Sequence, residues 1–229
     1  MEPATVIIPV KDEEDGLRFL LDEYKSSSFK GNSFVEFIFV IDGRTSDDSK
    51  SIAMEFSHHI IDQRDTHGKG AAIKQAVAVW RSNKTPRVVF LDADGSYSFD
   101  AVSDVLRTLE EGADVVSGSR FLSGKGRPKG MSRLHNFGNR LLSRISSIRN
   151  RRRISDLCTG LWGFDAEALE KLDIRAEGFD LEAEIAGKAR REGLDHREIA
   201  VGWSQRKGGT SKLSSLRDGF IIMMRILRT

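Results

Sequence analysis

The sequence predicts an α/β fold built on a parallel sheet. Short apolar and β-branched runs such as Thr5–Val10 and Arg87–Leu91 are typical of strands that are buried on both faces. Segments of roughly 10 to 15 residues with helical periodicity separate these runs, and this alternation indicates βαβ units. Acidic and turn-forming residues follow the strand runs directly. Because open α/β sheets bind ligands beyond the carboxyl ends of their strands, these positions are the first candidates for a functional site.

The first half of the chain supplies most of this pattern. Four runs predict strands, the last of them more weakly: Thr5–Val10, Phe34–Ile41, Arg87–Leu91 and Ala113–Ser117. Four segments predict the intervening helices: Glu14–Tyr24, Ser46–Ser57, Gly70–Arg81 and Phe99–Glu111. Ser46 and Ser98 are the expected N-caps of the second and fourth of these helices.

The second half has a different character. Residues 120–153 contain 11 basic residues and no acidic one, and the glycine-containing segment Phe121–Met131 predicts a mobile loop. Apolar residues then recur at helical spacing from Leu134 to Ile148, with arginines on a neighbouring face, which predicts an amphipathic helix. Further strands are expected at Thr159–Phe164 and His196–Trp203, a helix at Leu181–Glu192, and an amphipathic helix from Leu213 to Leu227. We therefore expect a catalytic domain over residues 1–212 and a C-terminal helix over residues 213–229.

The two halves of the chain carry opposite net charges. The net charge is only +2, but residues 1–119 carry −8 and residues 120–229 carry +10. Such asymmetry predicts that a polyanion or an anionic membrane surface lies near the second half. With 39% hydrophobic residues the chain is not disordered, and a lone cysteine, Cys158, excludes a disulfide framework and suits a reducing compartment. No apolar stretch is long enough to span a bilayer, and no signal-peptide core is present.

Three carboxylate positions at strand ends are candidates for chemistry. Asp92 and Asp94 flank Ala93 directly after a predicted strand, where they can offer hard oxygen ligands to Mg²⁺ or Mn²⁺, and the alternative is a plain turn. Asp42 follows the second strand and can accept hydrogen bonds from a nucleobase or ribose, or simply form an Asp-Gly turn. Glu13 follows the first strand, and its alternative role is to complement a helix dipole.

Basic residues supply the second set of candidates. Lys69 lies between two glycines at the predicted start of a helix, where a phosphate can bind. The Walker A and GxGxxG patterns are absent, which argues against nucleotide hydrolases and dehydrogenases. The basic stretch from 120 to 153 suits phosphates or a membrane surface, and a solvated charged face is the alternative. Its aromatic residues are not regularly interleaved, so we expect no nucleic-acid partner. The five histidines show no zinc-ligand spacing, and Cys158 is expected to be a packed residue.

Several motifs occur in an order that resembles a known family. They are ATVIIPVKDEE, FVIDGRTSDDS, HGKGAAIKQAV, FLDADGS, VVSGSRF, GNRLLSRI, SDLCTGLWGF and GFDLEAEIAGKARREG. Over about residues 4 to 213 the chain resembles the family 2 glycosyltransferases, and within them the dolichyl-phosphate or polyprenyl-phosphate mannosyl- and glucosyltransferases. This resemblance implies a GT-A type fold with a mixed, mainly parallel sheet flanked by helices. Three positions depart from the family pattern: Ile41, Ser96 and Cys158.

The resemblance also implies roles for particular residues. Those expected at the nucleotide sugar are Pro9, Glu13, Asp42, Lys69, Asp92 and Ala93. Asp92 and Asp94 form the DxD element, with Asp94 as the direct metal ligand. Arg120 is expected to contact a phosphate, and Asp156 to have an acceptor-side or positioning role, with catalytic base as the fallback. Expected at the lipid phosphate are Arg133, Arg206 and Lys212.

The expected activity is inverting hexose transfer from GDP-mannose or UDP-glucose to a polyprenyl or dolichyl phosphate, with Mg²⁺ or Mn²⁺. A phosphomonoester is largely dianionic at neutral pH, so such an acceptor needs cations rather than a base. The enzyme is expected to be cytoplasmic and peripheral on the cytoplasmic membrane face, its C-terminal helix contacting the membrane or forming a homodimer. The first alternative is transfer to a glycan or small-molecule hydroxyl. The second is a sugar-1-phosphate nucleotidyltransferase, which the acidic VKDEEDG loop disfavours. The third is a non-catalytic nucleotide-binding protein, an alternative that remains because Ile41 departs from the family motif.

Overall fold

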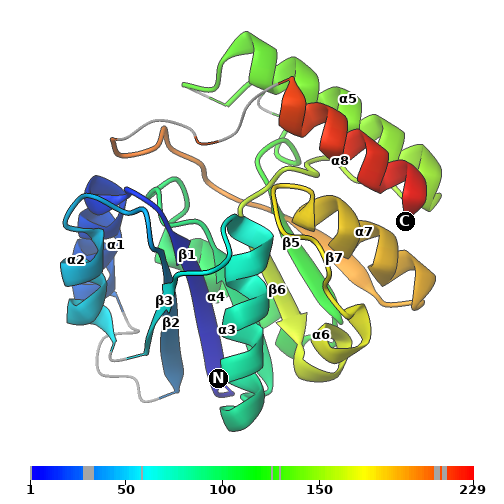
Figure 1. Ribbon diagram of the computed structural model, residues 1–229. Coiled ribbons are helices and arrows are strands. Elements are labelled where there is room, and N and C mark those ends of the chain that lie inside the picture. Colours follow the sequence, from blue (N-terminus) through cyan, green and yellow to red (C-terminus); the bar gives the residue numbers. More distant parts are fainter. Residues whose placement is uncertain are drawn as a thin grey trace.

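A seven-stranded sheet lies at the centre of the molecule (Figure 1). The computed structural model describes residues 2–27, 34–57, 59–124, 126–128, 130–208, 212 and 216–229. The strands follow the order β3-β2-β1-β4-β6-β5-β7, and β6 runs antiparallel to both of its neighbours while the other pairings are parallel. The strands are β1 Ala4–Val10, β2 Val35–Asp42, β3 Ile60–Gln63, β4 Arg87–Leu91, β5 Val115–Ser119, β6 Leu161–Asp165 and β7 His196–Ala200.

Helices cover both faces of this sheet. Alternation along β1 shows why, since Ile7 packs into one hydrophobic cluster while Val6 and Ile8 pack into another on the opposite face. The helices are α1 Glu14–Ser26, α2 Ser49–Phe56, α3 Lys69–Asn83, α4 Phe99–Glu110, α5 Arg133–Asn150, α6 Ala166–Leu172, α7 Leu181–Arg191 and α8 Arg217–Arg228. The predicted α/β architecture, with a mainly parallel sheet, is confirmed.

Some predicted boundaries were wrong. The sequence analysis missed β3 and α6, because runs of 4 and 7 residues are too short to show a clear period. Ser46 is not an N-cap: its backbone N–H donates to Asp12 Oδ1 at 2.8 Å, and α2 begins after Asp48. Ser98 does occupy the N-cap position of α4. The last strand ends at Ala200 rather than Trp203.

Two helices form a layer of their own beside the carboxyl ends of the strands. Figure 1 shows α5 and α8 side by side, and both pack on α7. Arg225 of α8 donates to Asp180 Oδ2 at 2.7 Å, which ties α8 to the start of α7. Leu213, the predicted start of the C-terminal helix, lies outside the described residues. None of the helices that the structure describes is long and apolar enough to cross a membrane.

Candidate active site

A cleft of about 710 Å³ opens where the carboxyl ends of β1, β2 and β4 meet α5 and α8. The topology explains its position, since loops from parallel strands converge at this edge of the sheet. Most of the residues that the sequence singled out line it: Pro9, Glu13, Asp42, Lys69, Asp92, Ala93, Asp94, Arg120, Arg206 and Lys212. Asp156 and Arg133 do not line it. Segments that are far apart in the sequence therefore meet around one cavity.

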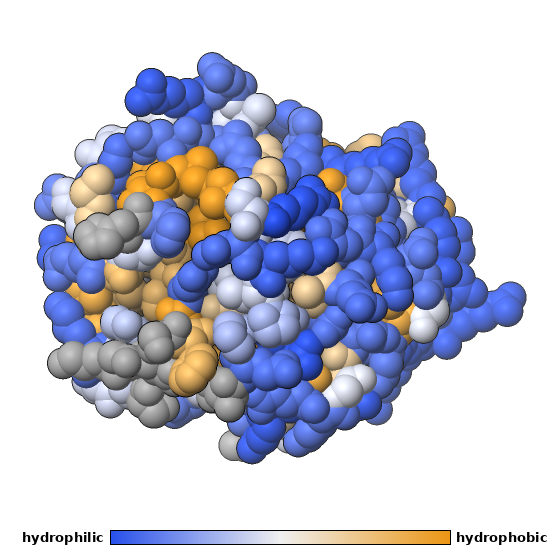
Figure 2. All heavy atoms as spheres, turned by 90° about the horizontal axis from the view of Figure 1, so that it is seen from below, coloured by the Kyte–Doolittle hydropathy of each residue, from blue (hydrophilic) through white to orange (hydrophobic). Residues whose placement is uncertain are grey.

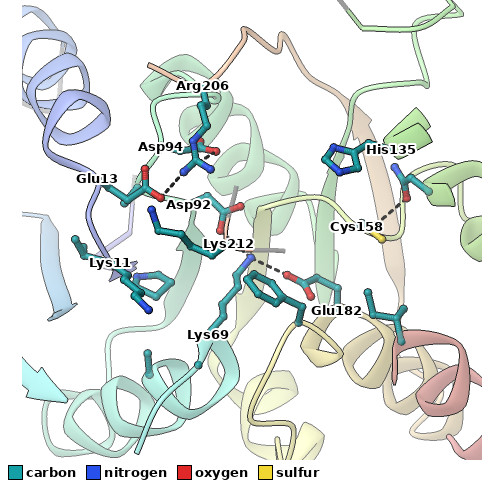
Figure 3. A pocket seen from close by; sticks show the side chains of 18 of the residues that line it. Lys11, Glu13, Lys69, Asp92, Asp94, His135, Cys158, Glu182, Arg206 and Lys212 are labelled. Atoms are coloured by element: carbon teal, nitrogen blue, oxygen red, sulfur yellow. Dashed lines mark hydrogen bonds and ion pairs between the residues drawn. The ribbon is translucent and has the colours of Figure 1, made fainter. Parts of the chain in front are cut away.

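The first aspartate of the Asp-Ala-Asp turn is held by a largely buried lysine. Lys69 Nζ lies 2.7 Å from Asp92 Oδ1 and 2.7 Å from Glu182 Oε1 (Figure 3). Burial lowers the pKa of Lys69, but the two carboxylates outweigh burial and raise it, so the ammonium stays charged. A Cβ on Gly160 would lie 1.9 Å from Asp92 Oδ2, so only glycine leaves room for this carboxylate. Asp92 is thus held in place by an ion pair within the protein, and it shares the Lys69 ammonium with Glu182.

The second aspartate faces an arginine from the C-terminal loop. Arg206 Nη2 lies 3.9 Å from Asp94 Oδ2, and Arg206 also donates to Glu13 Oε1 (Figure 3). The Ser96 backbone N–H donates to Asp94 Oδ1 at 3.0 Å, which orients the carboxylate. Burial raises the pKa of Glu13 to about 7, against the opposing effect of Arg206. One guanidinium therefore bridges two carboxylates from the ends of β1 and β4.

The donor set around Asp94 suits a divalent cation that a substrate helps to bind. Within the described part of the chain, no group of three or more His, Cys, Asp or Glu side chains is arranged to hold a metal ion. Asp92 is occupied by Lys69, which leaves Asp94 as the DxD carboxylate with no strong protein partner. Mg²⁺ is usually bound by one or two carboxylates together with substrate phosphates, and Asp94 fits that arrangement.

Asp42 is engaged by its own loop. Arg44 Nε and backbone N–H each donate to Asp42 Oδ1 at 2.9 Å, and Arg44 Nη2 donates to Oδ2 at 2.8 Å. These hydrogen bonds lower the pKa of Asp42 to about 2, although burial opposes them. Asp42 is therefore ionised at neutral pH, and Arg44 lies beside it on the cleft wall. Asp42 and Arg44 thus form an ion pair at the end of β2, on the wall of the cleft.

Asp156 lies behind Arg120 rather than in the cavity. Its side chain is fully buried, and it accepts hydrogen bonds from Arg120 Nε at 2.6 Å and from Asn139 Nδ2 at 2.6 Å. Burial lowers the pKa of Arg120, but Asp156 more than compensates and raises it, so Arg120 stays charged. Because both carboxylate oxygens are occupied and shielded from solvent, the geometry favours a positioning role for Asp156 over that of a base.

The remaining candidates, Lys212, Arg133 and Cys158, differ in their position relative to the cleft. Lys212 Nζ donates to the Asp12 carbonyl oxygen at 3.4 Å and lines the cleft. Arg133 is exposed at the first residue of α5, next to the cleft but outside it. Burial raises the pKa of the Cys158 thiol to about 12, so it stays protonated, as the expectation of a packed cysteine requires.

Three functional neighbours were missed by the sequence analysis. Glu182 holds Lys69, Arg44 holds Asp42, and Asn139 holds Asp156. One signal for Glu182 was available, because it shares a helix face with Ile185, Ala186 and Ala189, and a carboxylate on an apolar face needs a cationic partner. Nothing comparable marks Asn139, whose partner lies 17 residues away.

Comparison with known proteins found a matching family and several relatives. The model of the family described as glycosyl transferase family 2 matches residues 5–173. The chain is 28% identical over 228 residues to glycosyltransferase AglJ of Haloferax volcanii, covering 99% of this chain and 72% of that protein. It is 27% identical to the dolichyl-phosphate hexose transferase of the same organism, covering 93% of each chain.

A solved structure matches the fold. Glucosyl-3-phosphoglycerate synthase from Mycobacterium tuberculosis, in a complex with Mn²⁺, UDP-glucose and phosphoglyceric acid, superposes with a TM-score of 0.74 at 20% identity. The match covers 99% of this chain and 79% of that one, which confirms the expected GT-A type fold. The family match spans more than half of the chain and contains the strand ends that form the cleft. This glycosyltransferase therefore belongs to the glycosyl transferase family 2.

Proposed function

We propose that the protein transfers a hexose, with inversion, from GDP-mannose or UDP-glucose to a polyprenyl or dolichyl phosphate at the cytoplasmic face of the membrane. One observation carries this proposal. Each carboxylate that lines the cleft, among the described residues, already has a cationic neighbour: Glu13, Asp42, Asp92, Asp94 and Glu182. A hydroxyl acceptor needs a free base, whereas a phosphate acceptor needs only orientation and positive charge.

The donor is expected at the strand-end side of the cleft. Asp42 and Arg44 offer acceptors and donors to a base or ribose, and Lys69 keeps Asp92 in place beneath the diphosphate. A divalent cation on Asp94 would stabilise the negative charge that develops on the departing diphosphate. Arg206 lies beside the same carboxylate and adds a second positive charge at that point.

The acceptor phosphate is expected between Arg120 and Lys212. Asp156 and Asn139 hold Arg120 in one orientation, so its guanidinium is ordered before the substrate arrives. Arg133, exposed at the start of α5 between two residues that line the cleft, is expected to meet the phosphate as it enters. The name of one relative, dolichyl-phosphate hexose transferase, supports a lipid phosphate as the acceptor.

One observation favours a second candidate function. Burial raises the pKa of Glu13 to about 7, a value suited to a general base near neutral pH. If Arg206 moved away from Glu13, this carboxylate would be available to deprotonate a sugar or glycerate hydroxyl. Transfer to a small-molecule hydroxyl is therefore the alternative to transfer to a lipid phosphate.

The two candidates separate in an acceptor assay. Polyprenyl phosphate and polyprenol of equal chain length are each incubated with labelled GDP-mannose or UDP-glucose and Mn²⁺. We expect product from the phosphate alone, and about 10²- to 10³-fold less of it with Asp94→Asn. Asp62→Asn is the matched control, because Asp62 lies on β3 outside the cleft and pairs with Lys50. Equal transfer to polyprenol, or undiminished turnover by D94N, contradicts the proposal.

A further inference from the structure

Helix α5 faces the protein with its polar side. An amphipathic helix ordinarily buries its apolar stripe against the core. Here four apolar side chains of that stripe are exposed: Leu134, Phe137, Leu141 and Ile148. The buried side of α5 is instead mainly polar: Asn139, Leu142, Ser143, Ser146 and Asn150. Phe137 is 66% exposed and Ile148 is 72% exposed, so the helix presents its hydrophobic side outward.

Helix α8 differs in burying apolar residues, but it too exposes apolar side chains. Ile222 and Ile226 pack into the core, in the cluster that also contains Leu142 of α5. Away from the core, Phe220, Ile221 and Leu227 of α8 are exposed, and so is Leu216 at its N-cap. Together α5, α8 and this N-cap hold eight of the twelve large hydrophobic side chains that are exposed in the described part of the chain. We call these eight side chains the apolar platform.

Arginines border the apolar platform. Arg133, Arg140 and Arg144 share one flank of the exposed stripe of α5, because residues three, four and seven apart lie on one side of a helix. Arg217 and Arg228 are exposed on α8. Residues 120–153 contain no acid that would neutralise the α5 arginines. Apolar side chains flanked by arginine are the pattern of helices that lie in the interface of an anionic membrane.

The platform is continuous with the cleft. Leu134 is 59% exposed and also lines the cavity. Leu142 and Ile222, on the inner sides of the two helices, line the same cavity, which ends in the charged groups around Asp94. The cleft therefore has an apolar wall on the side of α5 and α8 and charged groups in its interior. An isoprenoid chain with a terminal phosphate has the same order of polarity.

We propose that the apolar platform rests on an anionic lipid bilayer and that the lipid phosphate enters the cleft beside Leu134, in the first turn of α5. This inference rests on the proposed function and assigns the surface through which its acceptor arrives. A second copy of the chain suits the platform less well, because a symmetric contact would bring the two arginine borders together, and Asp218 is the one acidic residue on α5 and α8. An anionic bilayer complements both the apolar side chains and their border.

The opposite end of the molecule provides a contrast. Figure 2 views that end from below, and its surface is mainly hydrophilic apart from a hydrophobic area toward the side where α1 and α2 lie. Met54 of α2 is 52% exposed, so it offers a matched site for a control substitution away from the platform. A charged residue there should leave any binding through α5 and α8 unchanged.

Vesicle flotation tests the proposal. The full chain is mixed with vesicles of phosphatidylcholine, or of phosphatidylcholine with phosphatidylglycerol, without donor or acceptor. We expect binding to the anionic vesicles, at least about tenfold weaker binding by the F137E/F220E double variant, and no change with Met54→Glu. The F137S/F220S variant serves if the charged pair unfolds, and circular dichroism checks the fold.

Two outcomes overturn the inference. One is equal binding of the wild type and F137E/F220E to anionic vesicles, and the other is a wild-type dimer in light scattering that F137E/F220E dissociates. Flotation needs no catalysis, so its result is independent of the proposed function. A water-soluble short-chain prenyl phosphate distinguishes the membrane surface from the active site. If F137E/F220E still transfers hexose to it but no longer binds vesicles, the variant has lost membrane binding and kept its catalytic site.

Discussion

Helices α4 and α5 are both amphipathic in sequence, but they turn opposite faces toward the protein. In the first half of the chain, α4 buries its apolar stripe, which includes Val102, Val105, Leu106 and Leu109. In the second half, α5 exposes its apolar stripe and buries asparagine and serine. The comparison teaches that periodicity predicts a helix and its two faces, while the surroundings decide which face is buried.

Buried polar groups explain the difference. Among the described residues, the first half buries one charged side chain, Asp42, whereas the second half buries Asp156, Asp180, Glu182, Glu184 and the imidazole of His196. Burial of a charge is tolerated only with a partner. Asn139 on the inner side of α5 supplies such a partner to Asp156, so the polar face of this helix must turn inward.

The largest effect expected from this comparison is on stability. Leu106→Ala in α4 should lower the free energy of unfolding by about 2 to 5 kcal/mol, because Leu106 is fully buried in the core. Leu141→Ala in α5 should change it by less than about 0.5 kcal/mol, because Leu141 is 47% exposed. Urea unfolding measures both. Equal losses would mean that α5 packs its apolar face after all.

The buried histidine should make the second half sensitive to acid. His196 is hydrogen bonded to Ser117 Oγ at 2.8 Å and stacks on Trp162, and burial lowers its pKa from 6.5 to about 4. The unfolded chain binds a proton below about pH 6.5, while the folded chain does so only near pH 4. Stability is therefore full above about pH 6.5, and about 3 kcal/mol is lost as the pH falls to about 4.

His196→Gln isolates this contribution. Glutamine does not titrate, so the variant should lose about 3 kcal/mol less than the wild type between about pH 7 and pH 4 in urea unfolding. The carboxylates titrate in both proteins, and their effect cancels in the difference. Identical pH profiles for the two proteins would show that His196 is not buried as a neutral ring.

The smallest effect concerns the inner face of α5. Asn139→Ala should cost about 1 to 3 kcal/mol, because Asp156 loses a donor and the Cys158 backbone N–H loses its acceptor at 3.2 Å. Asn136→Ala is the control, since among the described residues the Asn136 side chain is hydrogen bonded to the exposed Arg140 alone. Chemical denaturation compares the two. A larger loss for Asn136 would reverse the assigned faces of the helix.

Much of the fold was predictable from the sequence, and for a physical reason. A strand buried on both faces, such as Thr5–Val10, has no alternative to a continuous apolar run, and the polar residues after it mark the sheet edge. That logic led to Asp92, Asp94 and Lys69, which meet in the cleft. These residues are close to each other because parallel strands end at one edge.

The rest depended on contacts that no local pattern encodes. Glu182 reaches Lys69 across 113 residues, and Arg206 reaches Glu13 across 193. The position of Asp156 was not predictable either, since its burial behind Arg120 results from packing between segments and not from the spacing of acids. Orientation of α5 is the clearest case, because the sequence shows an apolar stripe but not whether protein or membrane covers it.

The most direct test asks whether the two ends of the cleft work separately. Mn²⁺-dependent binding of nucleotide sugar, by calorimetry, and binding to anionic vesicles, by flotation, are measured for D94N and F137E/F220E. We expect D94N to lose nucleotide binding and keep vesicle binding, and F137E/F220E to do the reverse. If D94N weakened vesicle binding, or if F137E/F220E weakened nucleotide binding, the account of a metal-binding donor end and a membrane-facing acceptor end would be contradicted.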